Sequence, residues 1–198
     1  MLKLRKIAVT GGIASGKTTV CRLLKKHGAY QVSADDIIHQ LLETNAKCIS
    51  EVIALLGTEI LTEEKIDRKK VATLVFSKPE KLEQLENLLH PLLLSKIEEE
   101  YQKVENDKRY CCFVAEVPLV QEIGKDKEFD LILAVVSDEK AAKKRFIAAG
   151  FPKQEYDRRM KRQWDVAKKA KQADFIITND GDLPHLEKQV KEFIHTLI

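Results

Sequence analysis

Gly11-Gly-Ile-Ala-Ser-Gly-Lys-Thr18 matches the phosphate-loop pattern G-x-x-x-x-G-K-[ST] at every fixed position. In such loops the glycines let the backbone approach a triphosphate, and successive N–H groups donate hydrogen bonds to it. The lysine, here Lys17, reaches the outer phosphates, and the hydroxyl of Thr18 can bind Mg²⁺. The motif therefore predicts binding of a nucleoside triphosphate and leaves the fate of the phosphate open.

The residues on either side of the loop fit the same motif. Residues 6–10 read as a short buried strand, and residues 18–27 read as a helix that Gly28 ends. Strand, loop and helix in this order are the context that the motif requires, and a helix N-terminus adds positive charge beside the phosphates. A chance glycine-rich turn is therefore the weaker interpretation.

Length and composition favour one sizeable globular domain. The chain has 198 residues, of which 44% are hydrophobic and 33% charged, values typical of folded proteins. No run of about 18 uncharged apolar residues is present, so we expect no membrane-spanning helix. The first residues lack the long apolar run of a secretory signal, and the four cysteines lack metal-ligand spacing. These features predict a cytoplasmic protein with reduced cysteines.

The net charge of +3 is unevenly distributed along the chain. Residues 143–171 contain eleven Lys or Arg and three Asp or Glu, a net charge of +8, which leaves a net charge of −5 on the remainder. A basic segment on a mildly acidic body predicts that one region meets an anionic ligand. For most of these lysines, however, a solvated helical face is the simpler interpretation.

Hydrophobic patterning predicts a parallel α/β fold. Besides the strand before the loop, the expected strands cover residues 29–33, 110–117, 130–136 and 174–178. The apolar runs at 110–117 and 130–136 show little alternation, which suits parallel strands covered on both faces. The expected later helices cover residues 34–43, 46–56, 68–76, 79–101, 139–149, 153–171 and 182–197.

Two residues are expected to shape helix ends, and one helical block stands out by its length. Ser137 is a natural N-cap for the helix at 139–149, and Pro91 should kink or interrupt the helix at 79–101. The block at 34–105 is too long for a plain crossover, so we expect a second layer beside the site. Ligands of such sheets bind beyond the carboxyl ends of the strands, where the loop, residues 33–35 and Pro118 lie.

Three charged residues extend triphosphate binding to a hypothesis of phosphoryl transfer. Asp35 follows the second strand, where a carboxylate can orient or deprotonate an acceptor hydroxyl. Capping of the helix at 36–43 explains an Asp at this place equally well. Arg145 and Arg159 can neutralise the transferred phosphoryl group if their helices close as a lid, but a surface ion pair is the simpler interpretation for either one alone.

Further motifs resemble those of dephospho-CoA kinases, in family order along nearly the whole chain. The loop alone is shared by many P-loop proteins, whereas the Ala-Asp-x-Ile, His-Pro and Val-Pro-Leu elements are far more specific. The matching positions are Thr10 to Val20, Ala34-Asp35 with Ile37 and His39, Leu89-His90-Pro91-Leu92, Val117-Pro118-Leu119 with Glu122, Phe129-Asp130, Arg145, Arg159 with Gln163, Lys169 with Ala173-Asp174, and Asn179 with Gly181.

The resemblance implies ATP-dependent phosphorylation of the ribose 3′-hydroxyl of dephospho-CoA, the last step of coenzyme A synthesis, with ATP and Mg²⁺. It also implies an α/β fold in which residues 1–198 form a single domain, a three-layer P-loop kinase core with a parallel five-stranded sheet. The core would comprise about 1–34, 108–142 and 172–198, the inserted helical substrate-binding region about 35–107, and the helical lid about 143–171.

Site roles follow from the same resemblance. Catalytic roles fall to Asp35, Lys17 and Arg145, and metal binding falls to Thr18. ATP binding falls to Gly11, Gly12, Ile13, Ala14, Ser15, Gly16, Lys17, Thr18, Thr19, Asn179 and Gly181. Substrate binding falls to Asp35, His39, His90, Pro118, Leu119 and Arg159. We expect no nucleic-acid, membrane or obligate protein partner.

Three positions depart from the family pattern. Ala14 stands where glycine is usual, so its backbone φ must tolerate a Cβ. Ser33 replaces an acid that usually precedes Ala-Asp, which can alter affinity for Mg²⁺ or substrate. Ala149 stands where a second lid arginine is often found, which can weaken lid closure. The loop lysine, the loop threonine and Asp35 are all retained, so we expect an active enzyme.

Three other functional classes were weighed against this resemblance. A GTPase switch needs D-x-x-G and N-K-x-D patterns, and neither occurs in the chain. An ATPase motor or nucleic-acid module would need an apolar strand ending in acids, but Ser137 intervenes before Asp138, and Trp164 is the only tryptophan. A kinase for another small acceptor shares the loop, the lid and the acid, and this alternative stays open.

Overall fold

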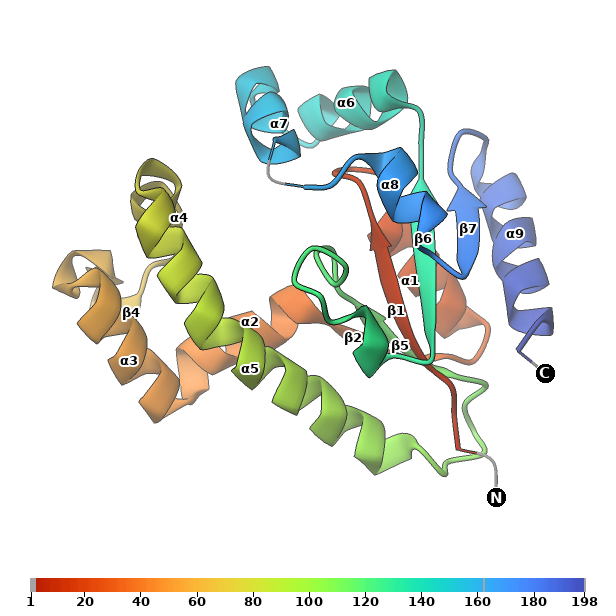
Figure 1. The fold of residues 1–198 in the computed structure, drawn as a ribbon, viewed down its shortest axis with the longest axis horizontal. Helices are drawn as coiled ribbons and strands as arrows, with labels where there is room; N and C mark the ends of the chain where they lie inside the picture. The colour runs from red at the N-terminus through yellow and green to blue at the C-terminus, as the bar shows by residue number, and fades with distance from the viewer. Residues whose placement is uncertain (1–2, 162, 198) are drawn as a thin grey trace. The chain divides into compact units, whose positions relative to one another are not determined.

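A five-stranded sheet supports the part of the chain that carries the phosphate loop (Figure 1). The computed structural model describes residues 3–161 and 163–197. It divides the chain into one unit of Met1–Val32 with Tyr101–Ile198, which contains the loop, and a second unit of Ser33–Glu100. The strand order in the sheet is β2-β5-β1-β6-β7.

The central strand of the sheet is also the strand that leads into the phosphate loop. β1 pairs in parallel with β5 and β6, and β6 pairs in parallel with β7. All six residues of β1 are buried, because its neighbours and the covering helices shield both of its faces. The predicted parallel sheet is thus confirmed. The strands are β1 (Lys6–Gly11), β2 (Tyr30–Ser33), β5 (Phe113–Glu116), β6 (Leu131–Val136) and β7 (Phe175–Thr178).

Helices cover both faces of the sheet, which gives the expected three layers. Helices α1 (Lys17–Lys26) and α9 (Leu183–His195) lie behind the strands in Figure 1, and α8 (Val166–Lys171) crosses in front of β1 and β6. Alternate strand positions and one face of each rear helix fill the core between them. Its fully buried members include Ile7, Val9, Val20, Leu24, Val114, Leu133, Val135, Ile177 and Val190.

Helix α6 (Glu139–Ala148) begins one residue later than its predicted cap implies. Asp138, not Ser137, is the N-cap, and its carboxylate accepts a hydrogen bond from the Ala141 N–H at 3.0 Å. The hydroxyl of Ser137 instead accepts from the Arg145 guanidinium. Both residue types cap helices well, so the arginine on the following turn decides between them.

The single helix expected at 153–171 is wrong, because the chain forms two helices there. Helix α7 (Lys153–Met160) ends before Trp164, and α8 begins at Val166. Asp165 caps α8 by accepting a hydrogen bond from the Ala167 N–H at 2.6 Å. Aspartate favours such cap positions over helix interiors, because its short side chain bonds the nearby backbone.

Strand β7 lies at one edge of the sheet, and a side chain from the last helix covers part of that edge. Gln189 accepts from the Thr178 N–H at 2.9 Å and donates to the Thr178 carbonyl at 2.8 Å. Both backbone groups of Thr178 are therefore satisfied without a further strand.

The second unit is mainly helical. Its elements are α2 (Ala34–Thr44), α3 (Ala46–Leu56), a short 3-10 helix (Thr58–Ile60), β3 (Leu61–Thr62), β4 (Lys65–Ile66), α4 (Arg68–Ser77) and α5 (Pro79–Val104), which ends in the first unit. The antiparallel hairpin of β3 and β4 was not predicted. Its turn residues Glu63 and Glu64 have φ values of 50° and 63°, and Asn or Gly would have signalled such a turn.

Pro91 does not interrupt α5, which is continuous from Pro79 to Val104. The interruption that the sequence allowed for is therefore wrong. Leu85, Leu89, Leu93 and Ile97 are buried at helical spacing on either side of the proline, and this apolar stripe offsets the loss of one backbone hydrogen bond. Among the described residues, no helix has both the length and the apolar character needed to cross a membrane.

Candidate active site

The phosphate loop turns between β1 and α1 through two glycines that no other residue could replace without strain. Gly11 has a φ of 147°, and a Cβ there would lie 2.2 Å from the Val135 carbonyl oxygen of β6. Gly16 has a φ of 99°, and a Cβ there would lie 2.1 Å from the Asn179 side-chain nitrogen. Both positions combine a left-handed φ with close packing, so the sheet and the turn after β7 hold the loop in shape.

Ala14 adopts a left-handed conformation with a φ of 52°. Its Cβ is tolerated there, as the sequence required, because this φ falls in the small allowed left-handed region. The conformation still costs about 1–2 kcal/mol relative to a right-handed one for a residue with a Cβ. Ala14 therefore holds this turn at an energetic cost that a glycine would not incur.

The ammonium of Lys17 lies against the loop itself. Its Nζ donates hydrogen bonds to the carbonyl oxygens of Gly12 at 2.7 Å and Gly11 at 3.2 Å. The side chain is thus folded over the concave side of the loop, at the place where a phosphate group must enter. A phosphate oxygen is a stronger partner than either carbonyl, because both the donor and the acceptor would be charged.

The hydroxyl of Thr18 donates to Oε1 of Glu116 at 2.8 Å, and sequence reasoning missed this acid. Glu116 ends β5, which is the neighbour of β1 in the sheet. In P-loop proteins Mg²⁺ is held by the loop Ser or Thr and an acid from a neighbouring strand. An apolar strand that ends in an acid could have identified Glu116 from the sequence. We considered this pattern only at residues 131–136, whereas it also occurs at 113–116.

A cavity of about 380 Å³ opens beside the first turn of α1. Asn179 follows β7, and its side chain donates to the Ser15 carbonyl at 2.8 Å, which ties this wall to the phosphate loop. Arg145 forms another wall and donates to Ser137 and, at 3.2 Å, to the Asn179 carbonyl. The cavity thus brings together residues from the start of α1, from α6 and from the turn after β7, three regions that the sequence assigned to the site. The cavity is lined by Thr19, Ala141, Lys144, Arg145, Asn179, Asp180, Gly181, Leu183 and Leu186.

Arg145 and Arg159 lie in different surroundings. Among the described residues Arg145 has neutral oxygen partners only, so the surface ion pair considered for it is not found. Arg159 pairs with Glu155 one helical turn away and lies over the rings of Phe146 and Phe151. Arg159 is therefore held within the α6–α7 region, and the structure does not bring it to the phosphate loop.

Asp35 lies in the first turn of α2 with an exposed side chain, in the second unit. The N-cap of this helix is Ser33, whose hydroxyl accepts from the Asp36 N–H at 3.3 Å. The capping role considered for Asp35 is therefore wrong. Ser33 takes that role, and the Asp35 carboxylate keeps its acceptor capacity for another partner.

The two histidines assigned to substrate binding also lie in the second unit. His39 contacts Glu43 on the next turn of α2 through Nε2 and Oε1 at 2.8 Å. His90 is half-buried in α5, where desolvation lowers its pKa and the Glu86 carboxylate opposes part of that change. A neutral imidazole at this place offers one donor and one acceptor.

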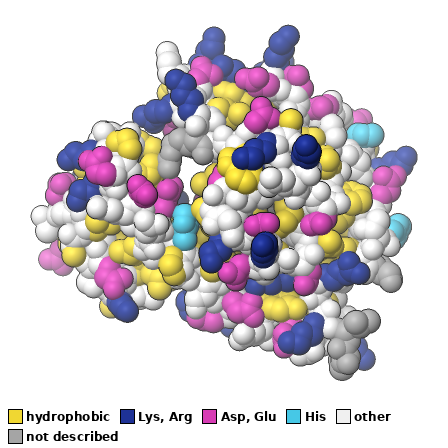
Figure 2. Space-filling model, in the orientation of Figure 1, with side chains coloured by type: hydrophobic (Ala, Val, Ile, Leu, Met, Phe, Trp, Pro, Cys, Tyr) yellow, Lys and Arg dark blue, Asp and Glu magenta, His cyan; other side chains and the backbone are white. Residues whose placement is uncertain are grey.

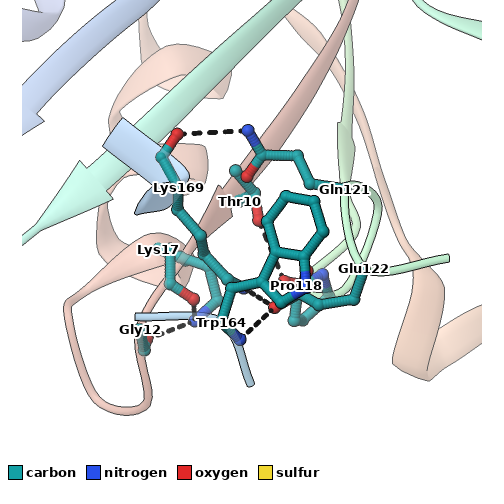
Figure 3. A network of polar contacts seen from close by, with 9 residues as sticks. Thr10, Gly12, Lys17, Pro118, Gln121, Glu122, Trp164 and Lys169 are labelled. Atoms are coloured by element: carbon teal, nitrogen blue, oxygen red, sulfur yellow. Dashed lines mark hydrogen bonds and ion pairs between the residues drawn. The ribbon is translucent and has the colours of Figure 1, made fainter. Parts of the chain in front are cut away.

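Pro118 and Leu119 follow β5 in the first unit, and their surroundings appear in Figure 3. The Pro118 carbonyl accepts from the Thr10 hydroxyl at 2.9 Å and from the Lys169 ammonium at 2.7 Å. The Leu119 carbonyl accepts from the Ile123 N–H at 3.1 Å. The turn after β5 is thus tied to the residue that precedes the phosphate loop.

Charges on the face drawn in Figure 2 are mixed. Lys and Arg side chains alternate with Asp and Glu side chains and form no continuous basic field on this face. Within the basic segment, Arg159 and Lys143 are each paired with an acid. Binding of a nucleic-acid backbone relies on clustered basic side chains, so this face offers no support for that alternative.

Comparisons with known proteins agree with the site. The dephospho-CoA kinase family model matches residues 5–185. A dephospho-CoA kinase of Protochlamydia amoebophila is 41% identical over 199 residues, which cover 100% of this chain and 98% of that protein.

Solved structures agree as well. A crystal structure from Thermus thermophilus superimposes with a TM-score of 0.82 at 28% identity, covering 97% of each chain. The dephospho-CoA kinase from Campylobacter jejuni gives a TM-score of 0.63 at 28% identity, covering 96% of each chain. With a phosphate loop, a magnesium-compatible Thr–Glu pair and a family match across nearly its whole length, this chain belongs to the dephospho-CoA kinase family.

Proposed function

We propose that this protein transfers the γ-phosphoryl group of ATP to the ribose 3′-hydroxyl of dephospho-CoA, giving coenzyme A and ADP. The observation that carries the proposal is the phosphate loop, shaped by Gly11 and Gly16 and tied to Asn179, in a chain of this family. Each side chain around the loop then has a task that its chemistry fits.

ATP occupies the loop and the cavity beside it. The loop N–H groups and Lys17 bind the phosphates, and Lys17 leaves its two carbonyl partners to do so. The adenine enters the cavity of about 380 Å³ lined by Arg145, Asn179 and Gly181. Arg145, to which the resemblance gave a catalytic role, can stack its guanidinium plane on the base here. The other loop residues of the ATP site are Gly12, Ile13, Ala14, Ser15, Thr18 and Thr19.

Thr18 and Glu116 fit a magnesium ion, because hard cations prefer hydroxyl, carboxylate and water oxygens. Magnesium would offset the negative charge of the phosphates between which the bond breaks. The hydrogen bond from Thr18 to Glu116 holds both oxygens at the end of β5 beside the loop. Glu116 joins Thr18 as a predicted metal-site residue on this ground.

Asp35 acts on the acceptor. Its carboxylate accepts the proton of the 3′-hydroxyl as that oxygen bonds to phosphorus and ADP leaves. His39, His90, Pro118 and Leu119 contact dephospho-CoA, and Arg159 binds its anionic groups after leaving Glu155. We assign residues 35–107 to substrate binding and 143–171 to the lid. The cytoplasmic location expected from the sequence stays a prediction.

A coupled ADP-release assay tests the proposal. Wild-type protein with ATP and Mg²⁺ should release ADP with dephospho-CoA and not with adenosine, nucleoside monophosphates or RNA. The Lys17→Ala variant should lose most of this turnover, because it lacks the charge that meets the outer phosphates. Turnover with another acceptor and none with dephospho-CoA would assign a different small-molecule kinase activity.

A further inference from the structure

Lys169 is a charged side chain with no solvent exposure, and the function proposed above does not use it. Its ammonium lies 2.7 Å from the Pro118 carbonyl and 2.7 Å from Oε1 of Glu122 (Figure 3). Burial lowers the pKa of Lys169, while the Glu122 carboxylate raises it. The pair is therefore a buried charge network with defined geometry.

Stability alone is a poor explanation for such a pair. Removing two charges from water is so costly that apolar replacements of similar volume are often neutral or stabilising. The second oxygen of Glu122 and the side-chain oxygen of Gln121 are also buried without a hydrogen-bond partner among the described residues. The geometry of the pair, rather than its net contribution to stability, is therefore the feature that needs an explanation.

One side of the network leads to the phosphate loop. The Pro118 carbonyl that Lys169 binds also accepts from the Thr10 hydroxyl at 2.9 Å. Thr10 has no solvent exposure and directly precedes Gly11, the first residue of the loop. Helix α8, which contains Lys169, also lies against the loop itself, since a Cβ on Gly12 would lie 3.0 Å from the Val166 side chain.

The other side leads to the connection between α7 and α8. Oε1 of Glu122, which pairs with Lys169, also accepts from the backbone N–H of Trp164 at 3.0 Å. Gln121 donates to the Lys169 carbonyl at 3.1 Å, which satisfies a carbonyl in the last turn of α8. A single buried lysine is thus connected to the start of the phosphate loop and to the connection between α7 and α8.

We propose that Lys169, with Glu122 as its charge partner, is a positioning residue that holds the phosphate loop in register with the connection between α7 and α8. It acts through Pro118 and Thr10 on one side and through Trp164 on the other. The role in turnover rests on the proposed kinase activity, whereas the effect on the loop does not.

Kinetics of matched variants test the role in turnover. Lys169→Met keeps an unbranched chain without the charge, and Lys171→Met removes an exposed lysine from the same helix. Misplacement of reacting groups by about 1 Å costs on the order of 10²-fold in rate, so we expect a kcat loss of that size for Lys169→Met. The KM for dephospho-CoA should stay near the wild-type value, and Lys171→Met should match wild type throughout.

Two further variants test the contacts that lead from Lys169 to Thr10 and from Lys169 to Trp164. Thr10→Val removes the hydroxyl at similar volume and should reproduce part of the kcat loss, whereas Thr10→Ser should retain activity. Glu122→Gln should lower kcat as well, and the Lys169→Met/Glu122→Gln double variant should lose no more than the worse single variant, because the two act as a unit. The emission of Trp164, the only tryptophan, should shift in Glu122→Gln.

Hydrogen exchange separates positioning from general stability. In Lys169→Met the amides of Gly11–Lys17 should exchange about tenfold faster while those of α9 keep the wild-type rate, as expected for local opening. This measurement also applies if wild-type protein fails to phosphorylate dephospho-CoA, a failure that would overturn the proposed function alone. If Lys169→Met does not fold, Thr10→Val and Glu122→Gln are measured in the same way.

Three results would overturn the positioning role. They are unchanged kcat in the folded variants of Lys169, Glu122 and Thr10, multiplicative losses in the double variant, or exchange that rises equally in the loop and in α9.

Discussion

Helices α7 and α8 are neighbours in the basic segment, yet different forces hold them. α7 packs on α6, since its buried Tyr156 meets the ring of Phe146 and Asp157 pairs with Lys143, and a partly exposed ion pair contributes at most about 1 kcal/mol. α8 contains the fully buried Lys169 and touches the phosphate loop through Val166. The difference teaches that one end of a basic segment can pack on a neighbouring helix while the other end is anchored to the sheet. We propose that lid motion is confined to α6 and α7.

The largest effect is expected at Asp35, which lies in neither α7 nor α8. It tests whether this residue accepts the proton of the acceptor hydroxyl. Asp35→Asn keeps the shape of the side chain and removes its basicity, so kcat should fall about 10²–10⁴-fold, the range for general acid–base groups. ATP affinity should remain near wild type, as measured by titration with a non-hydrolysable analogue. Asp36→Asn, one residue along the same exposed turn, is the matched control. An unchanged kcat would remove Asp35 from the chemistry.

A smaller loss is expected on the α7 side. Arg159→Met should lower kcat/KM about 10²-fold, because it removes a charged hydrogen-bond donor to the anionic groups of dephospho-CoA. Its thermal midpoint should stay near wild type, because its ion pair with Glu155 is partly exposed. Lys153→Met at the start of the same helix serves as the control. Wild-type kinetics with a lower midpoint would make Arg159 a structural residue and weaken the contrast between the two helices.

Helices α1 and α9 are also fixed to each other, because Glu187 of α9 contacts Lys26 and His27 at the end of α1. Hydrogen bonds from Lys26 and His27 lower the pKa of Glu187 to about 2. Because this pKa is depressed, its stabilising contribution is complete above the ordinary glutamate pKa of about 4.3 and disappears as the pH falls towards 2.

Glu187→Gln should therefore lower the thermal midpoint at pH 7, and the difference from wild type should shrink between pH 4.5 and pH 2. Glu192→Gln, on the same helix with a looser pair to Lys188, should show little change at any pH. Scanning calorimetry across this range provides the measurement. A difference that stays constant with pH would argue against the charged link.

The smallest effect concerns the partner of Arg159. A helical i,i+4 pair contributes about 0.2–0.5 kcal/mol, so Glu155→Gln should free Arg159 and lower the KM for dephospho-CoA by about twofold. Asp157→Asn frees Lys143 instead and should leave this KM unchanged. Steady-state kinetics at low ionic strength would detect the change, and a raised KM would show that Glu155 orients Arg159 for binding.

The loop and the sheet could be predicted because their signals are local. Gly11, Gly16 and Lys17 stand in a fixed motif, and four of the five strands contain a run of at least three apolar residues, β2 being the exception. The cap of α6 could not, since Ser137 and Asp138 are equally good caps and the distant end of Arg145 decides between them. The turn at Glu63 and Glu64 was missed because left-handed φ values there lack the usual Asn or Gly.

The candidate site divides in the same way. Asn179 and Arg145, which the family resemblance assigned to ATP binding and to catalysis, meet beside the loop. Glu116 and the partner of Lys169 required the folded chain, because pairing of β5 with β1 brings Glu116 to the loop and the path of α8 brings Lys169 to Glu122. A buried lysine has no signature in a segment with many exposed ones, and only tertiary packing distinguishes it.

Gln189 and β7 have a consequence for how copies of this protein behave in concentrated solution. An open strand edge is a template on which other chains can assemble into cross-β aggregates. Here a side-chain amide mimics the missing neighbour strand at Thr178, directly beside the exposed Ile176. Because Gln189 occupies both backbone groups of Thr178, this part of the edge cannot pair with another chain, and we expect loss of the glutamine to favour aggregation.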